Sequence, residues 1–282
     1  MRKPEDSHGA NGLNEPNGSH EPNGTNGTHE TYETYEAYGA YETHETHETY
    51  ETHPILLLST AYLPPVQWFW HAAHAGTAQV ELWESYHKQT YRNRCLIDSP
   101  QGAVALTIPV EKPENGSRLI KDMRISDHGD WRNKHWHALE SSYFNTPYFE
   151  YYQDDFRPIY ERRYEFLIDF NEAMISKCIE LTGISCKLGY TEKYIPAEDI
   201  TPDRKKTNDL STRGLSPDQT AISDYRSLIS PKTNIEADKD FTPLPYYQVF
   251  SERRNGRFLP NLSIADLLFN MGPESLFILS PR

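Results

Sequence analysis

The segment 55–83 constrains the fold of this chain more than any other part. It opens with a short apolar run, passes through Pro64-Pro65 and continues as a helical stretch at 66–75, followed by a glycine that can end the helix. Residues 79–83 then alternate polar and apolar side chains, as a strand does. A strand, loop, helix and strand in this order form a crossover typical of parallel strands, so the sequence predicts an α/β fold.

The loop between the first strand and the helix is a candidate binding loop. Ligands of α/β proteins gather at the carboxyl ends of the strands, and Tyr62 and Pro64 directly follow the first strand. The alternative is that this aromatic stretch is only a bulky piece of core. We expect the loop to bind and the helix behind it to give support, with Trp68 and Trp70 in the core or the pocket wall.

Three further strands are expected after the crossover. Residues 93–98 and 103–110 flank the turn sequence SPQG and predict a hairpin, and 119–126 alternates in a way that suits pairing with it. The sequence therefore predicts a single mixed-sheet domain, which we place at 54–282.

Helices are expected in three places. One can begin after Asp130 and run to about residue 144, and the clearest spans 164–182, where apolar residues recur at three- and four-residue steps. A third follows Ser263 and ends at a Gly-Pro pair. Residues 197–220 are rich in charge, Pro, Ser and Thr and predict a long mobile loop, which leaves open whether it orders over a ligand.

The first 53 residues predict a disordered tail. Residues 31–53 repeat with period three, which matches neither a helical stripe nor strand alternation and gives no buried face. Two alternatives compete with a solvating tail. Its six histidines and eleven carboxylates suit weak metal chelation, and its Asn-Gly-Ser/Thr triplets match glycosylation acceptors of secreted proteins.

Charge and composition restrict the partners. The net charge is −13, and residues 54–282 hold 30 acidic and 26 basic side chains, which argues against a broad nucleic-acid surface. Three cysteines without a CxxC pair indicate reduced thiols rather than a disulfide framework. No apolar run is long enough for a membrane span, and the N-terminus lacks the apolar stretch of a signal peptide. We expect a cytoplasmic protein of open oligomeric state.

The densest polar cluster is SYHKQTYRNR at 85–94. Arg92 and Arg94 would share one face if both lay in a strand, with Asn93 on the other. Paired guanidinium groups suit phosphate or carboxylate because each binds such a group through two donors. The alternative is that the two arginines are surface charges that pair with surplus acidic residues.

A second cluster, at 130–149, includes a candidate acid–base residue. On a helix, Trp131 and His135 lie four residues apart on one face, with Lys134 beside them. His135 suits general acid–base chemistry near neutral pH, and Lys134 can hold an anion. Equally, a histidine beside two tryptophans can be a hydrogen-bonded, half-buried side chain.

Metal and nucleotide motifs are missing from the sequence. His71 and His74 lie three residues apart, but no HExxH pattern or clustered carboxylate accompanies them. The P-loop, GxGxxG and GxSxG patterns are absent as well. We therefore expect neither a metal nor a cofactor.

Four stretches, in this order and spacing, resemble the WbqC-like protein family. They are AYLPPVQWF at 61–69, YHKQTYRNRCLIDSPQGAVALTIPV at 86–110, WRNKHWHALESSYFNTPYFEYY at 131–152 and NLSIADLLFNMGPESL at 261–276. The resemblance covers nearly all of 55–279. It implies a bacterial protein of surface-polysaccharide pathways such as O-antigen synthesis, and a transfer of an amino-acyl group such as glycyl onto an amino sugar.

The family pattern also implies a set of site residues in this chain. They are Tyr62, Pro64, Tyr91, Asn93, Arg94, Trp131, Lys134, His135, Tyr143, Pro147, Tyr148, Phe149, Asn261 and Asn270. One stretch departs from the pattern. Many members carry His-Gln-Pro-Asn before the Tyr-Leu-Pro of the first loop, whereas Leu58-Ser59-Thr60-Ala61 stand here.

Two functions remain open. The first is a cytoplasmic transferase that acts on a nucleotide-linked amino sugar, with the pyrophosphate near Arg92 and Arg94, stacking surfaces at Tyr62 and Trp131, and His135 as the base. The second is a non-catalytic carbohydrate- or protein-binding module of glycan assembly, which the 19 tyrosines and 5 tryptophans suit as well.

Overall fold

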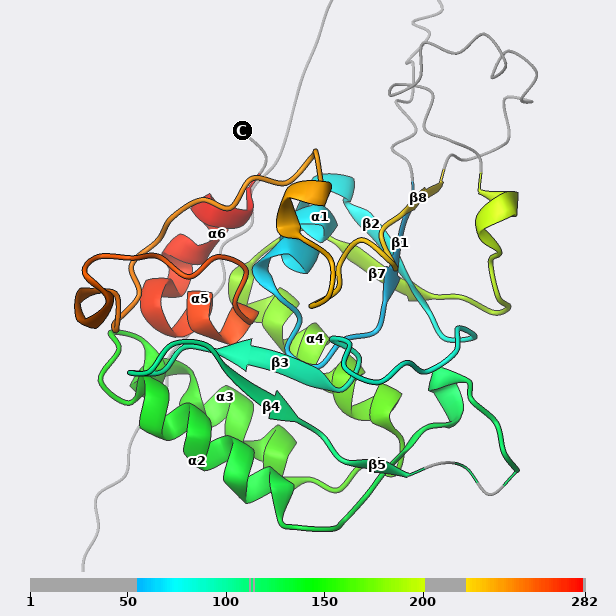
Figure 1. The fold of residues 1–282 in the computed structure, drawn as a ribbon, viewed down its shortest axis with the longest axis horizontal. Helices are drawn as coiled ribbons and strands as arrows, with labels where there is room; N and C mark the ends of the chain where they lie inside the picture. Colours follow the sequence, from blue (N-terminus) through cyan, green and yellow to red (C-terminus); the bar gives the residue numbers. More distant parts are fainter. Residues whose placement is uncertain (1–54, 112, 114, 201–221, 281–282) are drawn as a thin grey trace, which may run out of the picture. The chain divides into compact units, whose positions relative to one another are not determined.

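The computed structural model describes residues 55–111, 113, 115–200 and 222–280 (Figure 1). The expected tail at 1–53 and most of the expected loop at 197–220 lie outside the described residues. The domain boundary at residue 54 lies outside them too, and it stays a prediction.

A four-stranded parallel sheet organises the described residues, and the α/β prediction is confirmed. Its strands are β7 (Lys187–Tyr190), β2 (Thr77–Glu81), β1 (Ile55–Ser59) and β8 (Ile222–Asp224), in this spatial order (Figure 1). The apolar run of β1 lies between two parallel neighbours, which explains why its three central leucines are buried.

The predicted strand–loop–helix–strand opening is present. Helix α1 (Val66–Ala75) joins β1 to β2 and packs on both strands. Pro65 precedes its first turn, and Gly76 ends it with a φ of 68°. The side chain of Asn261 caps the helix from far along the chain, because its Oδ1 accepts a hydrogen bond from the backbone N–H of Gln67 at 3.0 Å.

The antiparallel strands are shorter than expected and form pairs of their own. Strands β3 (Arg94–Ile97) and β4 (Val104–Thr107) make the predicted hairpin, and β5 (Val110–Glu111) pairs with β6 (Arg124–Ile125). Parallel and antiparallel pairing both occur, but the described strands form three separate sheets, one parallel and two antiparallel, and not one mixed sheet. A short 3₁₀ helix at Ile120–Asp122 replaces much of the expected strand at 119–126.

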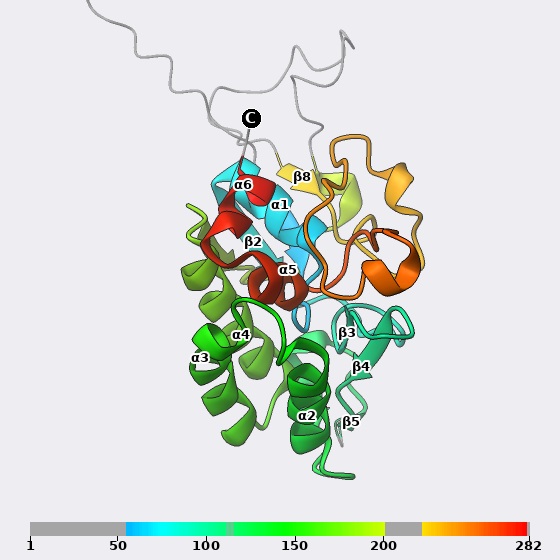
Figure 2. The same ribbon diagram turned by 90° about the vertical axis from the view of Figure 1, so that its left-hand side faces the viewer.

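Three helices follow strand β6 in the chain and lie side by side. They are α2 (Trp131–Tyr143), α3 (Phe149–Glu161) and α4 (Leu167–Thr182) (Figures 1 and 2). Asp130 precedes α2 as predicted, but its side chain does not cap the backbone. It has a φ of 48°, and its Oδ1 accepts from the Asn133 side chain at 2.8 Å.

Helix α5 (Ile264–Met271) is the central helix of the described residues. It contacts α1, α2, α3 and α4, and all of its residues except Met271 are buried. The side chain of Ser263 caps it by accepting from the backbone N–H of Ala265 at 3.2 Å. The short helix α6 (Ser275–Leu279) follows and packs on α1 and α5 (Figure 2). None of the described helices combines the length and apolarity that a membrane crossing requires.

The turn between α5 and α6 provides a first prediction. Gly272 has a φ of 56° and ψ of −131°, and a Cβ atom there would lie 2.4 Å from the ring of Tyr148. Gly272→Ala is therefore expected to lower the free energy of unfolding by about 3 kcal/mol or more, from backbone strain and steric overlap together. Urea denaturation measures the loss. Gly116→Ala is the matched control, since its φ is also positive, at 72°, but no atom lies within 4 Å of the added carbon. Equal losses in the two variants would exclude overlap with Tyr148 as the cause.

Candidate functional site

A pocket of about 890 Å³ lies at the carboxyl ends of the parallel strands. We call it the edge pocket, and its lining includes Trp83, Glu84, Arg92, Tyr194, Asp224 and Arg226. Trp83 and Glu84 follow β2, Tyr194 follows β7, and the last two residues end and follow β8. Because parallel strands end at the same edge of a sheet, residues far apart in sequence meet there. This is the position at which open α/β sheets bind ligands.

An ion pair between Arg92 and Glu84 forms one wall of the edge pocket. Nε and Nη2 of Arg92 donate to the two carboxylate oxygens of Glu84, at 2.8 and 2.5 Å, and both side chains are more than nine-tenths buried. Nη2 also donates to the hydroxyl of Ser59, the last residue of β1, at 3.0 Å. Within the described residues Nη1 of Arg92 makes no hydrogen bond, so this donor is available to a ligand.

A second charged group of the edge pocket is centred on Arg226, which follows β8. Arg226 donates to both carboxylate oxygens of Asp224, at 2.9 and 2.8 Å, and to the buried carboxylate of Glu81 at 3.2 Å. Glu81 also accepts from the Thr191 hydroxyl at 2.7 Å. These bonds connect the ends of β2, β7 and β8 and hold the charged groups in fixed positions.

Aromatic and cationic side chains complete the lining. Tyr194 is half exposed, and its ring lies 5.4 Å from the guanidinium carbon of Arg226. Trp83 donates through Nε1 to the carbonyl of Thr191 at 3.2 Å, which fixes its ring. His87 and Lys232 are exposed at the pocket. The pocket thus offers carboxylates for hydroxyl groups, cations for an anion and two rings for stacking.

Arg92 is the one predicted site residue that lines the edge pocket. Arg94 starts β3 while Arg92 precedes it, so the two guanidinium groups do not share a strand face, and Arg94 lines a different pocket together with Asn93. Tyr91 is buried, and its carbonyl accepts from the backbone N–H of Tyr62 at 2.8 Å.

Tyr62 and His135 lie together, but in the core. The Tyr62 hydroxyl is 3.0 Å from Nδ1 of His135 and 2.7 Å from the hydroxyl of Tyr160. Burial lowers the pKa of His135 to about 4, and a hydrogen bond to the backbone of Thr107 offsets only part of this shift. His135 is therefore neutral at pH 7. It is 6% exposed, and neither it nor Tyr62 lines the edge pocket.

The remaining residues of the second predicted cluster have different surroundings. Lys134 is exposed on α2. Trp131 is buried, its ring packs edge-on against His135, and its indole N–H has no partner among the described residues.

The other predicted site residues hold the fold together. The first loop is buried, and the carbonyl of Pro64 accepts from the backbone N–H of Ile264 at 2.9 Å. Asn261 caps α1, and Tyr148 packs on Gly272.

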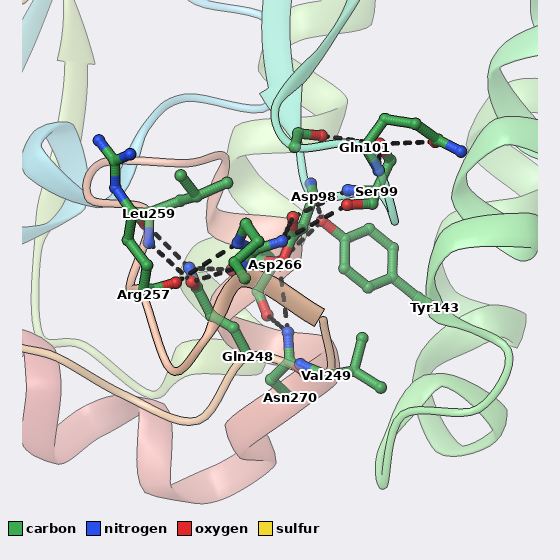
Figure 3. A network of polar contacts seen from close by, with 12 residues as sticks. Asp98, Ser99, Gln101, Tyr143, Gln248, Val249, Arg257, Leu259, Asp266 and Asn270 are labelled. Atoms are coloured by element: carbon green, nitrogen blue, oxygen red, sulfur yellow. Dashed lines mark hydrogen bonds and ion pairs between the residues drawn. The ribbon is translucent and has the colours of Figure 1, made fainter. Parts of the chain in front are cut away.

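Tyr143 belongs to a buried polar network around Asp266 (Figure 3). The carboxylate of Asp266 accepts from the hydroxyls of Tyr143 and Tyr246, at 2.9 and 2.7 Å, and from the side-chain amides of Gln248 and Asn270, at 3.1 and 3.3 Å. Tyr143 also accepts from the backbone N–H of Asp98 at 2.9 Å. Burial raises the pKa of Asp266 to about 7, and the nearby charge of Asp98 adds to the shift.

Sequence reasoning missed most of the edge pocket. Tyr194, Asp224 and Arg226 were not singled out, because β7 and β8 have only four and three residues and were not expected. Glu84 was not singled out either, although it directly follows the strand expected at 79–83. The available signal was positional, since charged and aromatic residues follow each parallel strand. In the part of the chain that the structure describes, no three His, Cys, Asp or Glu side chains gather as a metal-ligand set.

The fold and the site together define an α/β protein with a polar pocket at the carboxyl edge of its parallel sheet. The model of the WbqC-like protein family matches residues 60–278, and the chain belongs to this family, as the four sequence stretches predict. The chain is 29% identical over 193 residues to the uncharacterized protein Rv1507c of Mycobacterium tuberculosis, a match that covers 67% of this chain and 81% of that protein. No solved structure matches the chain.

Proposed function

We propose that this protein is a cytoplasmic transferase that acts on a nucleotide-linked amino sugar in the synthesis of a bacterial surface polysaccharide, with amino-acyl transfer as the reaction. The edge pocket is the substrate site of this proposal. The observation that carries it is the position of two fixed arginine–carboxylate pairs and two aromatic rings at the carboxyl edge of the sheet.

Each part of a nucleotide-linked sugar has a complementary group in the edge pocket. Tyr194 and Trp83 provide flat surfaces on which a base or a sugar can stack. Nη1 of Arg92 and the ammonium group of Lys232 are cationic donors for the phosphates. The carboxylates of Glu84 and Asp224 can accept from sugar hydroxyls while their arginines hold them in place.

The catalytic roles of His135 and Lys134 stay a prediction. For His135 to take a proton from a substrate in the edge pocket, Tyr62 and the Thr107 backbone would have to release the imidazole. His87 lines the pocket and is exposed, so it is the better placed imidazole for acid–base chemistry. A comparison of turnover in His87→Ala and His135→Phe decides between them.

Ligand binding tests the proposal through Tyr194→Ala. A nucleotide-linked amino sugar is expected to raise the melting temperature of the wild-type protein, because a ligand that binds only the folded state stabilises it. Loss of the Tyr194 ring is expected to weaken binding about tenfold, since stacking of a base on an aromatic ring contributes about 1–3 kcal/mol. Differential scanning fluorimetry gives the shift and calorimetry the affinity.

The matched control is Tyr151→Ala, which removes an exposed tyrosine from α3, outside the edge pocket. It should leave the ligand-induced shift unchanged. Absence of a shift with any nucleotide-linked sugar in the wild-type protein would reject the proposal.

A second candidate is a non-catalytic carbohydrate-binding module. The pairing of Arg92 with Glu84 and of Arg226 with Asp224 favours it, since groups fixed in this way bind well but are poor proton carriers. In the same experiment, stabilisation by free oligosaccharides and none by nucleotide-linked sugars would favour this function.

A further inference from the structure

A second, smaller pocket of about 330 Å³ borders the β3–β4 hairpin. We call it the hairpin pocket, and its lining includes Lys88, Asn93, Arg94, Thr107, Ile108 and Val110. It shares no lining residue with the edge pocket, although both use the segment 83–94. Arg92 belongs to one pocket and Arg94 to the other, so this segment serves two separate sites.

The hairpin pocket carries uncompensated positive charge. Its two cations are Lys88 and Arg94, and none of its lining residues is acidic. Neither cation forms an ion pair within the described ranges, whereas Arg92 and Arg226 at the edge pocket are both paired with carboxylates. A pocket of this charge favours an anion, and a guanidinium group favours a carboxylate or a phosphate that accepts two hydrogen bonds.

Two residues that line this pocket each have one buried polar atom without a partner among the described residues. Nδ2 of Asn93 donates to the carbonyl of Ile108 at 2.8 Å, which fixes the amide so that Oδ1 is the free acceptor. This Oδ1 atom and Nε of Arg94 are both shielded from solvent and make no hydrogen bond among the described residues. Asn93 is 5% exposed. Buried polar atoms without partners are rare and unfavourable, which points to a group that is bound in the working protein.

One of the unpaired atoms, Nε of Arg94, is a hydrogen-bond donor and the other, Oδ1 of Asn93, is an acceptor. This difference indicates which chemical groups the ligand must have. The arginine supplies donors and Lys88 supplies charge, while Asn93 needs a donor from the ligand. That donor must be neutral, because an ammonium group would be repelled by the two cations. Ile108 and Val110 offer apolar wall for the remainder of a small molecule.

We propose that the hairpin pocket binds a small organic carboxylate that carries a neutral hydrogen-bond donor, a hydroxyl or an amide N–H, beside its acid group. Both unpaired atoms are shielded in the unliganded pocket, so the ligand's donor reaches Oδ1 of Asn93 only as the Arg94 side chain moves onto the carboxylate. The site does not depend on what the edge pocket binds, and it provides a second substrate or effector position next to it.

Isothermal titration calorimetry at low salt with lactate and propionate tests the site. The two acids share the same three-carbon skeleton, but only lactate has a hydroxyl beside the carboxylate. We expect lactate to bind with a dissociation constant of about 1 mM, given its few atoms, and propionate at least several-fold more weakly. Lys88→Gln and Arg94→Gln should each weaken lactate binding about tenfold, which is the effect of one lost charge-assisted hydrogen bond.

Two controls keep the outcome decisive. Arg157→Gln removes an exposed arginine of α3 and should leave lactate binding unchanged. Lys88 is exposed and forms no ion pair with any described residue, so its replacement tests the site even if Arg94→Gln fails to fold. The inference is overturned if the wild-type protein binds neither acid, if both pocket variants bind lactate as the wild type does, or if only inorganic phosphate binds. Because no nucleotide-linked sugar is present, these outcomes are independent of the test made at the edge pocket.

Discussion

Replacing Asp266 with alanine is expected to lower the free energy of unfolding by about 3–5 kcal/mol. The carboxylate accepts four hydrogen bonds in a site closed to solvent. Alanine leaves the buried hydroxyls of Tyr143 and Tyr246 without an acceptor, while the side-chain amides of Gln248 and Asn270 keep their bonds to backbone carbonyls. The donors come from α2, from α5 and from the segment that contains Tyr246 and Gln248, so these parts lose their common attachment. Urea denaturation of the full chain measures the difference.

The same residue is expected to give the stability a pH dependence. The pKa of Asp266 is raised to about 7 in the folded protein, above its value of about 3.9 in the unfolded chain. The folded state therefore binds more protons between these values, and this contribution to stability is full below pH 4 and is lost as the pH rises through 7. His135, with its pKa lowered to about 4, has the opposite effect in the same range, since its contribution is lost as the pH falls.

The variant Asp266→Asn isolates the contribution of Asp266 to the pH dependence of stability. Asp266→Asn cannot ionise, so the difference in unfolding free energy between wild type and variant should fall by up to about 1.4 kcal/mol per pH unit between pH 5 and 6.5 as the pH is raised. Asp154→Ala, at an exposed position of α3, should be neutral within about 0.5 kcal/mol. A difference that stays constant across this range would show that the carboxylate has an ordinary pKa.

The second large effect is expected at the Arg92–Glu84 pair. Arg92→Met leaves Glu84 buried without its counter-ion and should cost about 3–5 kcal/mol of stability. The double variant Glu84→Leu with Arg92→Met removes both charges, and it should be more stable than Arg92→Met alone by several kcal/mol, because a buried pair can often be replaced by apolar residues at little cost. Both variants are expected to lose ligand binding at the edge pocket.

An exposed ion pair is the matched control for the variants of the Arg92–Glu84 pair. Arg124 and Glu165 form a salt bridge in which both side chains are more than half exposed, and its removal should change stability by about 1 kcal/mol or less. If the double variant proved less stable than Arg92→Met alone, the unpaired charge of Glu84 would not be the source of the loss. In that case the packing of the arginine itself would be responsible.

The elements that the sequence predicts best are those with a strong local signal. The crossover at 55–81 has an apolar strand, a proline pair and a terminating glycine, and α4 and α5 have regular apolar spacing. Helix α3 was missed, since it contains Pro158 and many tyrosines and charges. Strands β7 and β8 are too short for a periodic signal, and they exist because β2 and β1 offer them parallel edges.

The site was harder to predict for a related reason. Whether Arg92 and Arg94 share a pocket depends on the residue at which β3 begins, and a shift of one or two positions redirects both side chains. The histidine and tyrosine of the predicted site do meet, but burial cannot be read from their identity, and both lie in the core. Family resemblance points to residues that matter without separating those that hold the fold from those that face a ligand.

The cap on α1 has a consequence for how the protein is made. Gln67 depends on Asn261, and Val66 and Pro64 are bonded to Leu262 and Ile264, almost two hundred positions later in the chain. On the ribosome, the backbone N–H groups of Val66 and Gln67 at the amino end of α1 therefore lack these partners until residues 261 and 262 have been translated. Contacts between residues so far apart in sequence favour slow, late folding. Nascent chains that stop short of residue 261 would leave the amino end of α1 uncapped.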